Sequence, residues 1–256
     1  ILSYTLAVIP TFVLMGLLAN VSGATRDLYD AANAWFGRFR GGLAIATVAA
    51  NAIFAAVSGV SIASAAMFSK ISLPQMLAHG YDKRLSLGTV AGSSILGMLI
   101  PPSILLIIYG ILANESIGQL FIAGVVPGLI LVLIYSVGIW LMIRFRPRLV
   151  DSTAGGPQGY GFRKMSVVTL RAWGVAALIL LVLGGMYGGF FTPTEAGGIG
   201  AFGALVLALV KRRLTWGNIK TTLLETGHVT ASIFFLLIAA QMYSRMIALS
   251  GVASYF

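Results

Sequence analysis

The sequence has no cysteine and few charged side chains. Only 9% of its 256 residues are charged, and it contains two histidines and seven acids, whereas an ordinary soluble domain carries about 25% charged residues. The absence of cysteine excludes thiol catalysis, disulfides and cysteine-ligated metals. The acids are scattered, and His79 and His228 lie at the ends of apolar runs, where a solvated interfacial role is more common than a catalytic one. An enzyme is therefore not predicted.

Apolar residues dominate the composition. They make up 58% of the chain, the mean hydropathy is +0.95, and long apolar runs alternate with short polar ones. The net charge of +10 comes from clusters of Lys and Arg between those runs and not from one helix face, which excludes a nucleic-acid-binding domain. This pattern predicts an all-α integral membrane protein that crosses the lipid bilayer several times.

The apolar runs differ in length. They cover Tyr4–Val21, Leu43–Val57, Ile62–Leu77, Leu85–Ile100, Ile104–Ala113, Ile117–Ile143, Val175–Phe191, Ala196–Val210 and Val229–Leu249. The central runs are shorter than the roughly 20 residues that a spanning helix needs. Their length favours a re-entrant helical hairpin over 43–77 and a broken helix over 85–113, although two full spans in place of the hairpin would leave the loops on the same sides.

Basic residues predict the orientation. Most of them fall in loops on one side of the membrane, namely Arg26, Arg38, Arg40, Lys70, Lys83, Arg84, Arg144, Arg146, Arg148, Arg163, Lys164, Arg171, Lys211, Arg212, Arg213 and Lys220. The positive-inside rule makes this side cytoplasmic, and the four tryptophans nearby are typical of a membrane boundary. The polar segment Asp151–Tyr160 is expected to be a cytoplasmic loop.

Two segments have the spacing of amphipathic helices. Between Thr25 and Arg40 the apolar residues recur every three or four positions, and Trp216–Thr226 is a weaker copy. Such helices lie in the membrane interface, either as plain surface linkers or as arms that brace a rigid frame. Between these segments, the run from Thr192 to Glu195 predicts a capped helix start in which Glu195 is structural.

Two features are costly in a bilayer. One is the small, hydroxyl-rich stretch Ser58–Ala66 between two short apolar runs, and the other is Gly97–Ser103, which places Pro101 and Pro102 inside an apolar run. Proline has no amide hydrogen and the residue before it avoids helical geometry, so the helix must break there. Non-helical backbone at membrane depth is tolerated only against protein or an aqueous cavity.

Together these features predict a binding site without ionisable side chains. Many secondary transporters bind ions and anions at discontinuous helices near the midplane, although a proline kink or a close packing contact would explain either feature alone. Half-helices beginning near Ser61 and Ser103 direct their positive ends to where an anionic group would bind. The expected sodium ligands are the Ser58 hydroxyl and the unwound carbonyls of Gly97, Ile100 and Pro102.

A series of short motifs runs through nearly the whole chain. These are Ile9-Pro10-Thr11-Phe12, Met15-Gly16, Ser58-Gly59-Val60-Ser61, Gly80-Tyr81-Asp82, Gly97–Ser103, Tyr109-Gly110, Ser116-Ile117-Gly118, Leu120-Phe121, Ala123-Gly124, Pro127-Gly128 and Tyr187–Ala196. In this order they resemble the large membrane subunit of tripartite ATP-independent periplasmic (TRAP) transporters.

The resemblance implies a sodium-driven importer of organic acid anions in the bacterial inner membrane, working by an elevator motion. A periplasmic substrate-binding protein would deliver the substrate and a small membrane subunit would join the frame. No cofactor is implied beyond sodium as the coupling ion. The positions that match one sodium site are Ser58, Gly97, Ile100 and Pro102, and those expected near the substrate are Ser61, Ser103 and Gly59.

On this resemblance the chain divides into four parts. They are a scaffold helix with an amphipathic arm (1–42), half of a transport domain (43–113), a spanning helix with a cytoplasmic loop (114–171), and further scaffold or transport helices with a second arm at 213–227 (172–256). The second, inverted half of the family's site has no match before Phe256, and the chain begins at Ile1 without methionine. We expect a piece of a longer polypeptide that holds half of the binding site and could not transport alone.

The sequence departs from the family pattern at one further position, and two alternative functions stay open. Val60 stands where the family usually has serine, so at that position only the backbone is expected to act as a ligand. A related ion-coupled carrier that works without a binding protein would share these features. So would a membrane scaffold or channel-forming subunit that does not transport. The sequence does not name the organic acid.

Overall fold

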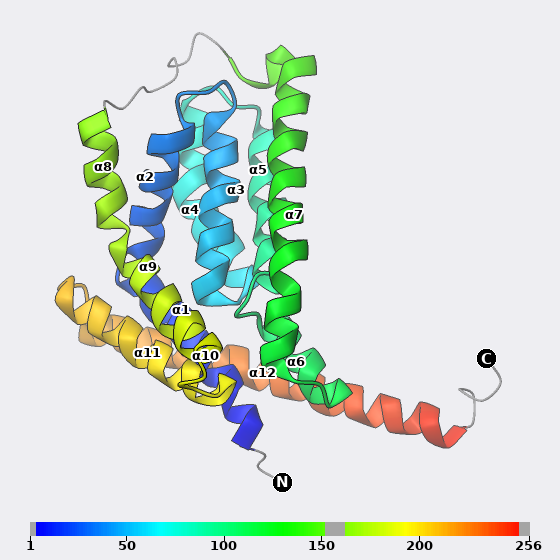
Figure 1. The fold of residues 1–256 in the computed structure, drawn as a ribbon. Helices are drawn as coiled ribbons and strands as arrows, with labels where there is room; N and C mark the ends of the chain where they lie inside the picture. The colour runs from blue at the N-terminus through cyan, green and yellow to red at the C-terminus, as the bar shows by residue number, and fades with distance from the viewer. Residues whose placement is uncertain (1–3, 152–161, 251–256) are drawn as a thin grey trace.

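The computed structural model describes residues 4–151 and 162–250, and the regular elements in both ranges are all helices (Figure 1). The long and medium helices are α1 (Val8–Val21), α2 (Ala24–Phe36), α3 (Gly42–Ser58), α4 (Ser61–Ala78), α5 (Lys83–Ser94), α6 (Ile104–Ala113), α7 (Ile117–Phe145), α8 (Phe162–Arg171), α9 (Trp173–Ile179), α11 (Pro193–Val210) and α12 (Trp216–Ser250). Shorter turns are η1 (Tyr4–Ala7), η2 (Ile95–Met98), η3 (Pro147–Leu149), the π-helical η4 (Leu180–Gly184) and α10 (Gly185–Tyr187). The predicted all-α fold is confirmed, while the loop predicted at Asp151–Tyr160 lies, beyond Asp151, outside the described residues.

Several described helices are suited to a bilayer. By length and composition α7, α11 and α12 can each span it, and two bent pairs bring the total to as many as five. The most apolar window of α7 has a mean hydropathy of 2.5 and is only 17% buried within the protein. Such a helix needs a lipid or protein environment that the described part of the chain does not provide. This finding agrees with the predicted multi-span membrane protein.

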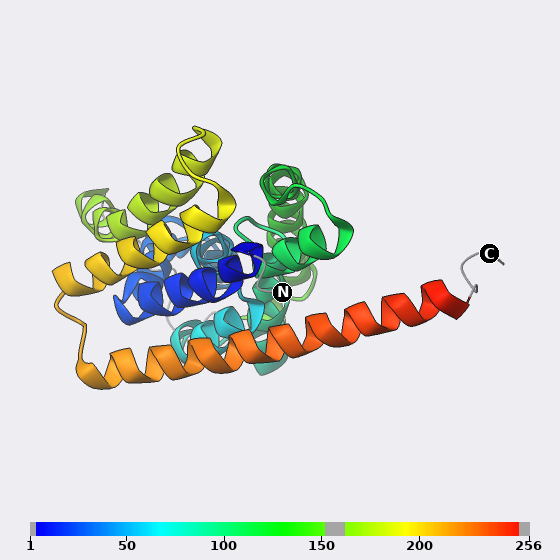
Figure 2. The same ribbon diagram turned by 90° about the horizontal axis from the view of Figure 1, so that it is seen from below.

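The helices form two groups. Figure 1 shows α2, α3, α4, α5 and α7 side by side, with α1, α11 and α12 crossing at one end of them. Seen from below in Figure 2, α1 lies between α11 and α12, and it packs against both. The group around α3 carries the candidate site, and α1 closes it from one end.

The core is centred on α1 and α3. Alanines along α3 are fully buried, including Ala44, Ala46 and Ala50, and their small side chains let the neighbouring helices α1, α2, α4, α5, α7 and α9 approach closely. Phe54 of α3 makes an edge-to-face contact with Phe68 of α4, with ring centroids 6.0 Å apart. Because most of α3 is buried, its sequence is apolar on nearly every side, and the polar Thr47 and Asn51 within it form side-chain hydrogen bonds.

The two predicted amphipathic segments take different forms. The first is α2, which bends away from α1 by 66° after Gly23 (φ +78°) and packs against α3 and α8. The second forms the start of α12, which continues without a break into the following apolar run. The interfacial placement of both segments stays a prediction.

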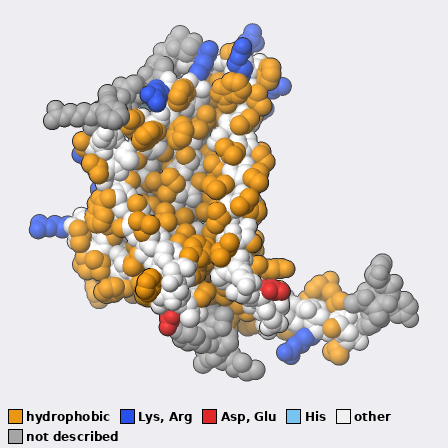
Figure 3. All heavy atoms as spheres, in the orientation of Figure 1, with side chains coloured by type: hydrophobic (Ala, Val, Ile, Leu, Met, Phe, Trp, Pro, Cys, Tyr) orange, Lys and Arg blue, Asp and Glu red, His pale blue; other side chains and the backbone are white. Residues whose placement is uncertain are grey.

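Many basic side chains gather at one end of the face drawn in Figure 3. This view shows apolar side chains along the sides and a group of Lys and Arg near the C-terminal end of α7, with further basic side chains elsewhere on the same face. The loop between α2 and α3 reaches the same end, since a Cβ at Gly41 would lie 2.5 Å from Ile143 of α7. At the other end of α2, Lys211 pairs with Asp27. These two basic groups therefore lie at opposite ends of α2, which runs alongside α7 in Figure 1, and their common cytoplasmic side stays a prediction.

The predicted capped helix start is confirmed at α11. The Thr192 hydroxyl accepts a hydrogen bond from the Glu195 amide (3.4 Å), and the Glu195 carboxylate accepts one from the Thr192 amide (2.8 Å). Pro193 occupies the first helical position, where its missing amide hydrogen costs nothing. The Glu195 carboxylate is therefore held by its own helix end.

Candidate functional site

The hairpin reverses direction within two residues. The helix α3 ends at Ser58, Gly59 adopts the left-handed conformation (φ +62°), and α4 begins at Ser61. The Gly59 amide donates to the Ala55 carbonyl at 3.0 Å, which closes the last turn of α3. Glycine suits this position because a side chain at positive φ is strained. The half-helix expected near Ser61 therefore begins there.

The second feature is a break in the following helical run. The helix α5 tightens into the 3-10 segment η2, which ends at Met98, and α6 starts only at Ile104. Pro101 and Pro102 lie in the gap, joined by a cis peptide bond. Since neither proline carries an amide hydrogen, the gap cannot be closed by a continuous helix.

The tip of the hairpin lies directly against this break. The Ile104 amide donates to the Gly59 carbonyl at 3.3 Å, and a Cβ at Gly59 would lie only 2.6 Å from the Pro102 carbonyl oxygen. On the other side, a Cβ at Gly97 would lie 3.2 Å from the Ser61 nitrogen. We call this contact, formed by Ser58–Ser61 and Gly97–Ser103, the tip–break junction.

Ser58 is the most informative residue of the junction. It is 1% exposed, and its hydroxyl has no hydrogen-bond partner among the described residues. An unsatisfied buried hydroxyl costs about 1–3 kcal/mol, so a ligand that binds this oxygen would recover that cost. A dehydrated cation held by hydroxyl and carbonyl oxygens is such a ligand.

Of the other predicted ligands, Gly97 and Pro102 border the hairpin tip, whereas Ile100 is in contact with α7. Gly97 and Pro102 are buried and border the hairpin tip through the contacts given above. The Ile100 side chain packs on α7, since a Cβ at Gly128 would lie 2.8 Å from its Cγ1. Within the described ranges, no three His, Cys, Asp or Glu side chains converge as metal ligands, so the junction offers neutral oxygens.

Ser103 has a different role from Ser58. Its hydroxyl donates to the Met98 carbonyl at 2.6 Å and accepts from the Leu106 amide at 3.4 Å. It therefore caps α6 and also ties the two sides of the break together. Ser61 lies across from it at the start of α4 and is half-buried. Of the two serines among the predicted substrate positions, Ser61 has the more accessible side chain.

Replacing Ser103 with alanine is expected to destabilise the protein by about 1–2 kcal/mol, because both an N-cap and a hydrogen bond across the break are lost. Thermal unfolding of the purified protein measures this change. The matched control is Ser72→Ala, since Ser72 is also a buried serine but bonds only to the Phe68 carbonyl of its own helix, a bond that adds little stability. Equal loss in the two variants would contradict the bridging role of Ser103.

Sequence reasoning did not assign roles to the glycines that enclose the junction. A Cβ at Gly16 of α1 would lie 2.7 Å from the Ser58 Cα, and one at Gly124 of α7 would lie 2.6 Å from the Leu99 carbonyl oxygen. Gly124 and Gly128 have the four-residue spacing of close helix contacts. That spacing is a signal that could have been used.

Tyr81 was also missed as a structural residue. It is 7% exposed, and its phenol oxygen accepts from the Leu43 amide at 3.2 Å. The neighbouring Asp82 amide donates to the Leu149 carbonyl at 2.9 Å. These bonds tie the base of the hairpin to the end of α7, and burial raises the pKa of the Tyr81 phenol.

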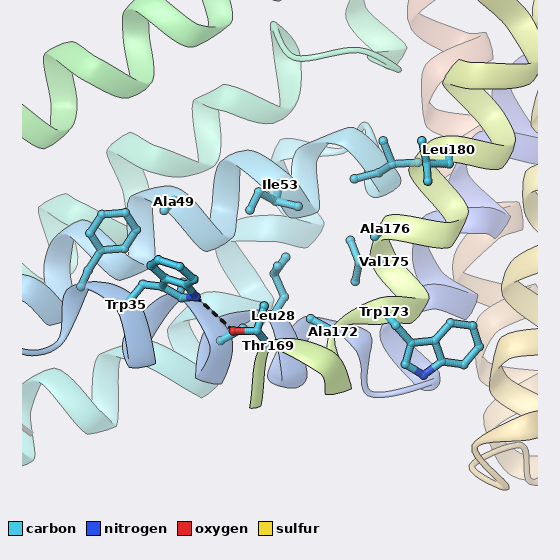
Figure 4. Close-up of a pocket in the computed structure, with 14 residues that line it drawn as sticks. Leu28, Trp35, Ala49, Ile53, Thr169, Ala172, Trp173, Val175, Ala176 and Leu180 are labelled. Atoms are coloured by element: carbon cyan, nitrogen blue, oxygen red, sulfur yellow. Dashed lines mark hydrogen bonds between the residues drawn. The ribbon is translucent and has the colours of Figure 1, made fainter. Parts of the chain in front are cut away.

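A separate cavity lies between α2, α3, α8 and α9. It has a volume of about 540 Å³, and nearly its whole lining is apolar. Figure 4 shows Trp35 and Thr169 at this cavity, where the indole N–H donates to the Thr169 hydroxyl at 3.0 Å. With no charged side chain in its lining, this cavity cannot orient a carboxylate. The tip–break junction remains the candidate functional site.

The comparisons with known proteins agree on one family. The profile of the tripartite ATP-independent periplasmic transporter DctM component matches residues 1–256. The C4-dicarboxylate TRAP transporter large permease protein DctM of Pseudomonas aeruginosa is 38% identical over 253 residues, which are 95% of this chain and 56% of that protein.

More distant relatives have other names. The ectoine TRAP transporter large permease protein TeaC of Halomonas elongata is 33% identical, covering 97% of this chain and 57% of that protein. The sialic acid TRAP transporter permease protein SiaT of Haemophilus influenzae is 30% identical, and the match covers 98% of this chain and 40% of that protein. The chain thus spans about half the length of the curated relatives it matches. Across that span, the ordered motifs and the profile match identify it as a member of the TRAP transporter DctM component family.

Proposed function

We propose that the protein containing this chain is the large permease subunit of a sodium-coupled importer of organic acid anions. Membership of the DctM family supports transport across the membrane. The observation that carries the sodium proposal is the buried hydroxyl of Ser58 beside the broken helix, which has no hydrogen-bond partner in the described part of the chain. Transport, and not catalysis, is the activity proposed, and no cofactor is needed beyond the ion.

The chemistry of the junction favours an alkali cation over a proton. The stretches 58–61 and 97–103 contain no Asp, Glu, His, Lys or Arg, so no side chain there can carry a transported proton. Hydroxyl and carbonyl oxygens instead match the ligands used for Na⁺ in unwound transporter helices. Ser58, Gly97, Ile100 and Pro102 are the proposed sodium ligands.

The substrate would bind on the other side of the same junction. The helices α4 and α6 both begin there, at Ser61 and Ile104, and helix N-termini favour anionic groups. Ser61 and Gly59 would contact the substrate, and Ser103 would set the position of the α6 start. The inverted half of the site would come from the part of the longer protein that this chain does not include.

The proposed partners follow from the family. A periplasmic substrate-binding protein would deliver the organic acid, and a small membrane subunit would pack on the permease. The elevator motion would carry α3–α6 across the inner membrane, with the basic end of the molecule on the cytoplasmic side. The apolar outer faces of α7, α11 and α12 would contact lipid or the small subunit.

Reconstitution of the complete permease, with its small subunit, in proteoliposomes tests this proposal. Uptake of organic acid is expected only when the substrate-binding protein and an inward sodium gradient are both present. The binding protein delivers the substrate and the gradient supplies the coupling ion, and neither the substrate nor the ion alone would permit the transport step. Radiolabelled uptake measures it, with potassium in place of sodium as the control.

Other outcomes would point to the alternatives. Uptake that persists without the binding protein would identify a carrier that works alone. Ionic currents above carrier rates would identify a channel-forming subunit, and sodium-independent uptake would overturn the proposed ion coupling.

A further inference from the structure

A second cavity lies between α5 and α7, away from the tip–break junction. Its volume is about 730 Å³, and Figure 1 shows the two helices side by side at this place. Leu85 and Thr89 line it from α5, and Ile134 and Ile139 line it from α7. None of the proposed ion or substrate ligands contributes to it, so the proposed function does not account for this cavity.

The middle of the cavity is an open apolar slot. Gly88 and Gly138 both line it, and a Cβ at either position would meet no atom within 4 Å. Ile139 is 7% exposed, whereas Ile134 is 59% exposed. The slot therefore has a closed floor and an open rim facing the membrane side of α7.

One end of the slot carries unpaired positive charge. Arg84 and Arg146 line it there, and in the described parts of the chain neither forms an ion pair. The carboxylate of Asp82 also lies at this end, but it accepts from the amides of Arg84 and Leu85 (2.8 and 3.2 Å) and caps α5. The two guanidinium groups are therefore available to an anion.

The apolar walls of the slot and the positive charge at one end indicate what kind of ligand it would bind. From Ile134 to its end at Phe145, α7 rises about 16 Å, which is comparable to one leaflet of a hydrocarbon core of about 30 Å. Apolar walls of that length with two cations at one end fit a molecule with an acyl chain and a negatively charged headgroup. A small hydrophilic anion would use the cations but leave the walls exposed to water.

We propose that this slot binds an anionic phospholipid. The phosphate contacts Arg84 and Arg146, and one acyl chain lies along Gly88, Gly138 and Ile134. Since α5 leads directly into the break near Gly97, the lipid holds the helix that positions the junction against α7. Membrane composition would in this way influence the site without any contact between the lipid and the transported ion.

The charge of the site is tested first. Native mass spectrometry of the complete permease assembly, purified from membranes and supplied with phosphatidylglycerol, counts the retained lipids. The double variant Arg84→Gln, Arg146→Gln is expected to retain about tenfold less phosphatidylglycerol, since two basic contacts are lost. The double variant Arg144→Gln, Arg148→Gln is the matched control, because it removes two positive charges from the same end and neither residue lines the slot; it should retain lipid like the unaltered protein.

The slot itself is tested by filling it. Gly138→Leu places a side chain into the open space and is expected to lower lipid retention by a similar factor, whereas Gly227→Leu, on α12, also enters open space and should leave retention unchanged. Thermal stabilisation by phosphatidylglycerol nanodiscs over phosphatidylcholine nanodiscs should fall in parallel. Unchanged lipid retention in both the Arg84→Gln, Arg146→Gln variant and the Gly138→Leu variant would overturn the proposal. So would equal stabilisation by inorganic phosphate alone, or a protein segment found in the slot.

Discussion

Gly59→Ala is expected to reduce sodium-dependent uptake by the complete permease at least about tenfold and to destabilise it by about 3 kcal/mol. The new Cβ would sit at a positive φ of 62° and only 2.6 Å from the Pro102 carbonyl oxygen. Because the neighbouring atom is backbone, the tip and the break must separate to accept it. Uptake in proteoliposomes and thermal unfolding measure the two effects.

Gly189→Ala is the matched control for this substitution. Gly189 has a similar positive φ of 77°, but a Cβ there would meet nothing within 4 Å. It therefore carries the conformational cost of about 1 kcal/mol without the contact. If both variants lose the same stability and keep the same uptake, the close approach of Gly59 to the break has no functional importance.

Ser58→Ala is expected to weaken sodium binding by about tenfold or more while leaving the protein folded. A hydrogen-bonding or ligand contact to a charged group contributes about 1.5–3 kcal/mol, which corresponds to this change in affinity. In the absence of sodium the variant should be as stable as the unaltered protein or slightly more so, because the buried Ser58 hydroxyl has no partner to lose. The sodium-induced rise in unfolding temperature measures both quantities.

Ser64→Ala separates ion binding from simple removal of a buried hydroxyl. Ser64 is also buried, and its hydroxyl likewise has no partner among the described residues, but it is not one of the proposed ligands. This variant should respond to sodium like the unaltered protein. A normal sodium response in Ser58→Ala, or an equal loss in Ser64→Ala, would refute the assignment of Ser58.

Local features of the candidate site could be predicted from sequence because they depend on near neighbours. Two prolines remove two amide hydrogens wherever they lie, so the break at Pro101 and Pro102 follows from the residues themselves. Likewise, the capping box at Thr192 and Glu195 involves residues three positions apart. The starts of α4 and α6 therefore fall where the sequence places them.

Hydrogen-bond partners across the site could not be predicted in the same way. The sequence places Ser58 among the expected sodium ligands and Ser103 near the expected substrate, but it gives the hydrogen-bond partner of neither hydroxyl. Only the packed structure shows how the two hydroxyls differ, because the Ser103 hydroxyl donates to the Met98 carbonyl whereas that of Ser58 has no partner among residues 4–151 and 162–250. That difference depends on how the chain folds back at the break, which residue types do not specify.

The sequence also did not predict where one helix continues into the next apolar run. The segments Trp216–Thr226 and Val229–Leu249 read as an amphipathic helix and a separate span, yet both belong to α12. Gly227 lies between them, and an isolated glycine costs a helix only about 1 kcal/mol. Packing interactions of that size decide whether the helix continues or bends, as α1 and α2 do at Gly23.

The sequence by itself determined the membrane class, the helical composition, the hairpin turn and the break, since these depend on hydropathy and on local backbone chemistry. The tertiary structure alone decided that Gly59 meets Pro102, that Gly16 and Gly124 enclose the junction, and that Arg84 and Arg146 share one slot. These contacts join residues far apart in the chain, and their formation depends on how whole helices pack together.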